Sequence, residues 1–185
     1  MNAPAPEDLV VERPAAGVLQ LTIRRPEVRN AMRTQTLAEI AAQLAAAADD
    51  DATKVVVLTG GTDVFAAGAD LREMAPLGPV EILTHERQRH WKAIATFPKP
   101  IVAAVCEYAL GAGCELALCC DIVVAGTNAQ FGQPEVNLGL IPGAGGTARL
   151  ARTCGKALAM QMVLTGKPIT AQAALAAGIA VEVDE

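Results

Sequence analysis

Two glutamates and three glycine-rich turns are the parts of this sequence best suited to chemistry. Glu115 stands within an otherwise apolar run, and Glu135 follows in a short extended segment. Small residues in a turn let a ligand approach the main chain, and helix N-termini offer unpaired N–H groups with a partial positive charge. Two such turns facing each other would form an oxyanion hole, a pair of donors for a developing negative oxygen. The three turns are residues 65–70, 110–115 and 141–147.

The two carboxylates could supply acid and base catalysis to a substrate carbonyl group held in that hole. Glu115 comes three residues after Ala112, which places both on the same side of the first turn of a helix. The alternative interpretation is that Glu115 and Glu135 are helix caps or solvated surface charges, and that the turns only allow close packing. Spacing alone leaves both interpretations open.

Alternating strand and helix patterns position these turns. Period-two alternation predicts a half-buried strand at 19–23, and apolar β-branched runs predict buried strands at 55–58, 101–105 and 122–125. This order predicts an α/β fold with a largely parallel sheet. Helices are predicted at 36–48, 80–97, 112–120, 147–152, 156–164 and 171–177.

Helix-end signals support several of these boundaries. Thr36 and Glu39 have the spacing of a capping box at the start of the first helix. Thr170 is the expected N-cap of the last helix, and Gly178 is the expected residue just past its end.

Composition and charge exclude other classes of protein. The net charge of −5 argues against a nucleic-acid partner or an anionic membrane surface. No apolar run reaches the roughly 20 residues of a transmembrane helix. The chain has no serine, which excludes a Ser-His-Asp hydrolase, and its cysteines and histidines lack metal-ligand spacing, so no metal site is expected. Residues 1–8 are expected to be a flexible N-terminal tail, and residues 9–185 one core domain.

Five ordered motifs resemble the crotonase superfamily of enoyl-CoA hydratases and isomerases. The resemblance extends from about residue 10 to the end of the sequence. It implies an α/β fold built as a spiral of repeated ββα units. Members of the family usually continue into a C-terminal helical module, which these 185 residues are expected to lack. The motifs are Phe65–Leu71, Ala109–Ala117, Cys120–Ile122, Phe131–Glu135 and Ile141–Thr147.

The resemblance implies a role for each matched residue. The oxyanion donors fall on the main-chain N–H groups of Ala69 and Ala112, and the acid–base pair falls on Glu115 and Glu135. The implied reaction is syn addition of water across the 2,3-double bond of a trans-2-enoyl-CoA. Glu115 would orient and deprotonate the water, and Glu135 would help hold it and exchange the proton at C2. No cofactor is implied, because coenzyme A is part of the substrate.

Two alternatives remain open. One is an enoyl-CoA isomerase or another crotonase-type reaction that uses the same oxyanion hole. The other is a catalytically idle fragment that binds acyl-CoA. The resemblance also implies a cytoplasmic homotrimer or dimer of trimers with an acyl-CoA partner and no membrane or nucleic acid, acting in fatty-acid β-oxidation or phenylacetate degradation.

A basic loop is the expected contact for coenzyme A. Arg24, Arg25, Arg29 and Arg33 fall within ten residues of an otherwise acidic chain, and a solvated face is the alternative interpretation. The resemblance places coenzyme A beside this loop and beside the first glycine-rich turn. The expected substrate-binding residues are Arg25, Val28, Arg29, Ala67, Asp70, Leu71, Arg72, Gly111, Pro142 and Gly143.

Overall fold

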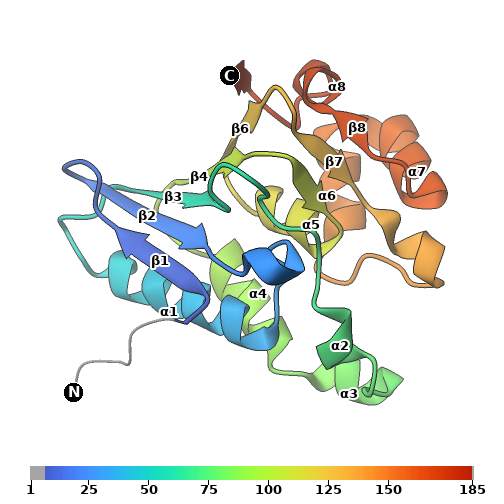
Figure 1. The fold of residues 1–185 in the computed structure, drawn as a ribbon, viewed down its shortest axis with the longest axis horizontal. Helices are drawn as coiled ribbons and strands as arrows, with labels where there is room; N and C mark the ends of the chain where they lie inside the picture. Colours follow the sequence, from blue (N-terminus) through green and yellow to red (C-terminus); the bar gives the residue numbers. More distant parts are fainter. Residues whose placement is uncertain (1–6, 185) are drawn as a thin grey trace.

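A six-stranded sheet forms the frame of the protein. The computed structural model describes residues 7–184. The strand order is β1-β2-β3-β4-β6-β9, in which β1 and β2 are antiparallel and every other neighbouring pair is parallel. The predicted α/β fold with a largely parallel sheet is therefore confirmed (Figure 1). The strands are β1 (Leu9–Glu12), β2 (Val18–Ile23), β3 (Val55–Thr59), β4 (Ile101–Val105), β6 (Ile122–Gly126) and β9 (Glu182–Asp184).

Helices α1 (Thr34–Ala48) and α4 (Arg87–Ala95) pack against each other along this sheet (Figure 1). The apolar stripe of α1 is buried as predicted, but the helix begins at Thr34 rather than at residue 36. The predicted capping box of Thr36 and Glu39 is wrong. The Thr36 hydroxyl accepts the Arg33 N–H at 3.3 Å, and Glu39 instead accepts the N–H groups of residues 7 and 8.

The predicted helix at 80–97 is also wrong as one element. It is divided into α3 (Pro79–Thr84) and α4, because His85 adopts an extended conformation with ψ of 144°. Arg87 then turns inward and is buried, with an ion pair of 3.0 Å to Glu73 of α2 (Leu71–Met74). A hydrophobic period does not reveal such a break, since both halves keep helical spacing.

A second sheet has three strands, in the order β5-β7-β8. Its strands are too short for a period-two signal, and none is predicted from the sequence. Figure 1 shows this sheet with α6, α7 and α8 at the end of the molecule away from β1. The elements are β5 (Tyr108–Leu110), α5 (Ala112–Ala117), β7 (Gln130–Gly132), α6 (Gly146–Thr153), α7 (Gly155–Thr165), β8 (Ile169–Thr170) and α8 (Ala171–Ala176), with two 3-10 helices, η1 (Pro26–Val28) and η2 (Pro134–Leu138).

Both helix-end signals of α8 are confirmed. The Thr170 hydroxyl accepts the Ala173 N–H at 3.3 Å, and Gly178 follows the helix with a φ of +74°. The predicted flexible tail, residues 1–8, lies only in part within the described residues. Residues 1–6 lie outside the described residues, whereas Asp8 is buried and forms an ion pair with Arg33.

Small side chains allow the backbone at Ala66 to approach the backbone of α5 closely. Ala66 is fully buried, and a Cβ atom on Gly113 would lie 2.1 Å from the Ala66 carbonyl oxygen. That separation is far below van der Waals contact, so only glycine fits at position 113, the second residue of α5. The close approach brings the turn before α2 directly against the N-terminus of α5.

Candidate active site

The three glycine-rich turns lie next to one another in the structure. The Ala66 N–H donates to the Tyr108 carbonyl at 2.9 Å, and the Leu110 N–H donates back to Ala66 at 3.1 Å. These bonds join the first two turns as a parallel bridge. The third turn reaches the second through Glu115, whose side chain binds the main chain at Ala144 and Gly146.

Two main-chain N–H groups are left to face a ligand at this junction. Met32 and Ala69 form a parallel bridge in which Met32 bonds the residues on either side of Ala69, so the Ala69 N–H points to the opposite edge. Ala112 begins α5, where N–H groups have no intrahelical partner. Within residues 7–184 neither amide has a hydrogen-bond partner. The positive φ of +52° at Gly111 favours glycine and turns the chain into the helix.

Glu115 is buried and held by one of its two oxygens. Its side chain accepts hydrogen bonds at Oε1 from Ala144 N–H at 2.7 Å and from Gly146 N–H at 2.8 Å. Gly146 is the first residue of α6, so the carboxylate also faces the positive end of that helix. Burial nevertheless raises the pKa of Glu115, although these bonds and the charge of Arg149 act in the opposite direction. Oε2 has no hydrogen bond to the described residues, and it is the oxygen available to a water molecule.

Glu135 lies beside the N-terminus of α5. A Cβ atom on Gly111 would lie 3.1 Å from Glu135 Oε1. Burial, together with a smaller contribution from the nearby charge of Glu115, raises the pKa of Glu135 to about 6. Both carboxylates therefore have elevated pKa values, the condition under which a carboxyl group can exchange protons near neutral pH.

Gln133 is a residue of the site that sequence reasoning missed. It is fully buried, and with its amide nitrogen turned to the carboxylate it donates to both Glu135 oxygens, at 3.0 and 3.1 Å. It also lies against the α6 turn, because a Cβ atom on Gly146 would come within 2.6 Å of the Gln133 amide. A polar residue two positions before Glu135, in an extended Gly-Gln-Pro segment, is the signal that points to it.

The other residues expected to bind substrate lie on several elements. Ala67 and Leu71 belong to the turn before α2 and to α2 itself, and Arg72 is exposed there. Pro142 is buried and Gly143 is exposed in the third turn. Val28 and Arg29 end η1, where Arg29 is exposed. Arg29 lines a pocket of about 290 Å³ together with Arg24, Pro26, Gly61, Thr62 and Asp63, among others.

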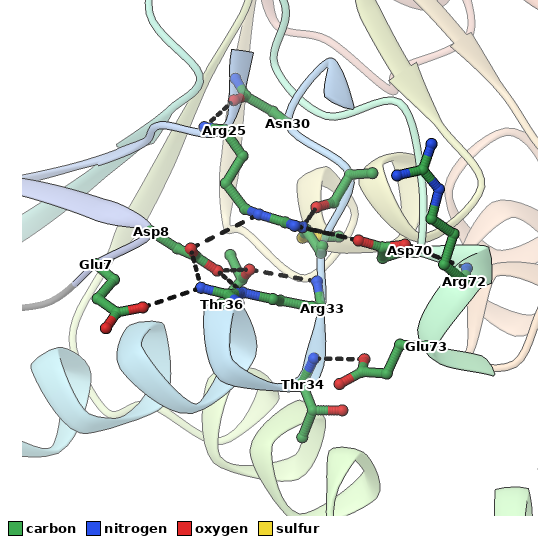
Figure 2. A network of polar contacts seen from close by, with 12 residues as sticks. Glu7, Asp8, Arg25, Asn30, Arg33, Thr34, Thr36, Asp70, Arg72 and Glu73 are labelled. Carbon is green, nitrogen blue, oxygen red and sulfur yellow. Dashed lines mark hydrogen bonds and ion pairs between the residues drawn. The ribbon is translucent and has the colours of Figure 1, made fainter. Parts of the chain in front are cut away.

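The structure does not favour Arg25 as a contact for coenzyme A. Its side chain is 12% exposed and forms ion pairs with Asp70 at 3.2 Å and Asp8 at 3.6 Å (Figure 2). Arg33 is likewise paired with Asp8, at 2.8 Å. The basic cluster is thus divided: Arg25 and Arg33 face internal carboxylates, and Arg24 and Arg29 remain exposed. Asp70 is correspondingly engaged by Arg25 rather than free for substrate.

Within residues 7–184, no group of three or more His, Cys, Asp or Glu side chains is arranged to bind a metal ion. No helix among these residues is long and apolar enough to cross a membrane. The five cysteines are free thiols, and burial raises the pKa of Cys114 to about 12, so this thiol is no nucleophile at neutral pH.

The family model for enoyl-CoA hydratase/isomerase matches residues 13–185. The chain therefore belongs to this family, and the resemblance to the crotonase superfamily is confirmed. It is 52% identical over 176 residues to 2,3-dehydroadipyl-CoA hydratase of Escherichia coli (strain K12), covering 95% of this chain and 69% of that protein. It is 48% identical over 163 residues to the mitochondrial enoyl-CoA hydratase of Pongo abelii, covering 88% of this chain and 56% of that protein.

Solved structures of the family share the fold. An enoyl-CoA hydratase subunit I from Geobacillus kaustophilus HTA426 matches with a TM-score of 0.92 and 40% identity, over 96% of this chain and 68% of that one. An enoyl-CoA hydratase from Bacillus anthracis matches with a TM-score of 0.90 and 33% identity, over 96% of this chain and 70% of that one. The crotonase-like fold expected from the sequence is confirmed, and the chain spans 56% to 70% of the lengths of these four relatives.

Proposed function

We propose that the protein is an enoyl-CoA hydratase that adds water syn across the 2,3-double bond of a trans-2-enoyl-CoA. The observation that carries this proposal is the placement of two carboxylates beside two free main-chain donors. Glu115 is anchored through Oε1, Glu135 lies against Gly111, and Ala69 and Ala112 present their N–H groups. The names of the relatives described above, which are hydratases, agree with it.

The thioester oxygen would lie between the Ala69 and Ala112 N–H groups. As a nucleophile attacks C3, the electrons of the double bond move toward this oxygen and form an enolate. Main-chain donors already fixed in place stabilise that charge without reorganising. Removing one such donor typically costs roughly 3–4 kcal/mol in transition-state binding.

The two glutamates would then balance the protons of the addition. Glu115, ionised, takes a proton from water through Oε2 while the water oxygen bonds to C3. Glu135, protonated, gives a proton to C2 as the enolate returns to the thioester. Water is consumed, no oxidant is needed, and one proton passes from Glu115 back to Glu135 to restore the starting state. The raised pKa of Glu135, about 6, favours the protonated form that this step uses.

The coenzyme A portion would extend from the oxyanion hole toward η1. We assign Val28 and Arg29, with Ala67, Leu71 and Arg72, to this portion, because Arg29 lines the pocket and the Ala67 N–H donates to the Arg29 carbonyl at 3.0 Å, which joins the two segments. Gly111, Pro142 and Gly143 are assigned to the thioester and acyl side. The similarity to 2,3-dehydroadipyl-CoA hydratase supports that compound as substrate, with a place in phenylacetate degradation. A cytoplasmic homotrimer or dimer of trimers is proposed with it.

The test is the loss of enoyl absorbance with crotonyl-CoA, octenoyl-CoA and 2,3-dehydroadipyl-CoA. We expect hydration of at least one, with 2,3-dehydroadipyl-CoA the fastest. Conversion of a 3-enoyl to a 2-enoyl thioester without hydration would support an isomerase instead. Binding of acyl-CoA with no turnover of any substrate would support a catalytically idle fragment, and either result would overturn the proposal.

A further inference from the structure

Arg25 is enclosed by acceptors although it belongs to the most basic stretch of the chain. Its main-chain N–H donates to Asn30 Oδ1 at 2.7 Å, which closes the loop of η1 around it. Its guanidinium donates from both terminal nitrogens to Asp70 Oδ2 at 3.2 Å, and from one of them to the Ala31 carbonyl. The Nε atom faces Asp8 Oδ1 at 3.6 Å. Figure 2 shows the guanidinium between Asp8 and Asp70.

Two of these acceptors, Ala31 and Asp70, lie on the two segments of the bridge that orients the Ala69 N–H, a donor of the proposed oxyanion hole. Ala31 directly precedes Met32, and Asp70 directly follows Ala69, while Met32 and Ala69 are the partners of an isolated bridge. Only two hydrogen bonds form that bridge: Met32 N–H to Gly68 at 2.8 Å and Asp70 N–H to Met32 at 3.0 Å. Arg25 therefore links the Ala31 carbonyl on one segment of the bridge to the Asp70 side chain on the other, next to the Ala69 amide.

We propose that Arg25 is a positioning residue that fixes the direction of the Ala69 N–H, and that it does not bind coenzyme A. The inference rests on the proposed function insofar as the Ala69 N–H receives the thioester oxygen. The planar guanidinium presents five donors in a rigid fork, so one side chain can hold Asp70 and Ala31 at a set separation. A lysine keeps the charge but has one flexible ammonium and cannot fix both acceptors in the same way.

The effect on catalysis follows from the geometry of the donor. A displacement of about 1 Å in a catalytic group can cost on the order of 10²-fold in rate. Because free coenzyme A has no thioester oxygen, its binding does not depend on the Ala69 N–H. Loss of Arg25 should therefore lower kcat while leaving the affinity for coenzyme A near its original value.

Kinetics of four variants test this assignment. In Arg25→Met we expect kcat with crotonyl-CoA to fall by about 10-fold to 100-fold, with the Kd for coenzyme A changed by less than about twofold. Arg25→Lys should recover part of the loss. Arg29→Met is the comparator, with a raised KM and a nearly unchanged kcat. Arg13→Met is the control with unchanged activity, because Arg13 pairs with Asp50 at the surface, where half of its side chain is exposed. Circular dichroism confirms folding of each variant.

A binding measurement tests the inference without turnover. Acetoacetyl-CoA is an acidic 1,3-dicarbonyl thioester, and an oxyanion hole stabilises its enolate. We expect Arg25→Met to reduce the preference for acetoacetyl-CoA over coenzyme A, and the bound enolate absorbance, by about 10-fold, while Arg13→Met changes neither.

The outcomes separate this inference from the proposed function. A raised Kd for coenzyme A with normal kcat in Arg25→Met would show that Arg25 binds coenzyme A. Equal losses of kcat and of binding to coenzyme A and acetoacetyl-CoA would show that Arg25 only supports the fold. Either result overturns the inference. A wild-type protein that hydrates nothing would overturn the proposed function. In that case a lost preference for acetoacetyl-CoA in Arg25→Met would still support the positioning role.

Discussion

The Gly146 N–H donates to Glu115 Oε1 at 2.8 Å across 31 residues of sequence. This bond ties the N-terminus of α6 to a carboxylate on α5 and leaves the other oxygen of Glu115 for chemistry. A glycine is required there, because a Cβ atom at position 146 would lie 2.9 Å from Glu115 Cγ and 2.6 Å from the Gln133 amide. One position thus sets the packing of Glu115 and of Gln133, which bonds Glu135.

Replacing Gly146 by alanine tests that relationship. We expect Gly146→Ala to lower kcat by at least about 10-fold and to destabilise the fold by about 1–3 kcal/mol, since the added methyl overpacks a buried site. The measurements are steady-state hydration and urea unfolding. Gly143→Ala is the matched control for stability, because no atom lies within 4 Å of a Cβ atom there. Equal unfolding free energies for the two variants would contradict the packing argument.

The two carboxylates can be tested by isosteric amides. Glu115→Gln and Glu135→Gln keep the side-chain shape but cannot exchange the proton. Each should lower kcat by about 10²-fold or more, with a smaller change in KM, as expected for loss of an acid or base. Near-normal hydration by both variants would remove the acid–base assignment.

The pH dependence of stability tests the environment of Glu135. Its pKa in the folded state is about 6, above its ordinary value of 4.5, so the folded protein binds more protons than the unfolded chain between these values. The stability associated with the protonated carboxyl is therefore present at low pH and is lost as pH rises from about 4.5 to 6. Relative to Glu135→Gln, the wild type should lose unfolding free energy over this window. Urea unfolding of both proteins at several pH values measures this loss. If the unfolding free energy of the wild type minus that of Glu135→Gln stays constant or rises over this window, the raised pKa of Glu135 is contradicted.

The oxyanion donor at position 112 is a main-chain group, which allows a graded series. Ala112→Gly keeps the N–H and should retain most activity. Ala112→Val should be impaired, because a branched side chain crowds the thioester. Ala112→Pro removes the donor at the first position of α5, where proline is otherwise tolerated. It should lower kcat/KM by the equivalent of roughly 3 kcal/mol in transition-state stabilisation. A folded proline variant as active as the wild type would show that another donor holds the oxygen.

Local patterns in the sequence account for the parts of the fold whose signals are local. The period-two alternation of β2 and the β-branched run of β3 predict their strands, because side chains in a strand alternate between faces or are buried on both. The ordered motifs likewise mark Glu115, Glu135, Ala69 and Ala112 as candidates. Residue types at fixed spacing are sufficient for that, since each motif is continuous in the chain.

The tertiary structure alone decided which charged and polar groups face one another. Arg25 and Arg29 are indistinguishable in the sequence, yet Arg25 is enclosed because Asp70, 45 residues away, is brought against it, while Arg29 remains exposed. Gln133 became part of the site only when its amide was brought between Gly146, the first residue of α6, and the Glu135 carboxylate. Such pairings depend on contacts between distant segments, and a one-dimensional pattern carries no information on which side of a loop a neighbouring strand will lie. Burial then changed the chemistry, because the pKa of Glu135 rises only where its carboxylate is removed from water and placed near Glu115.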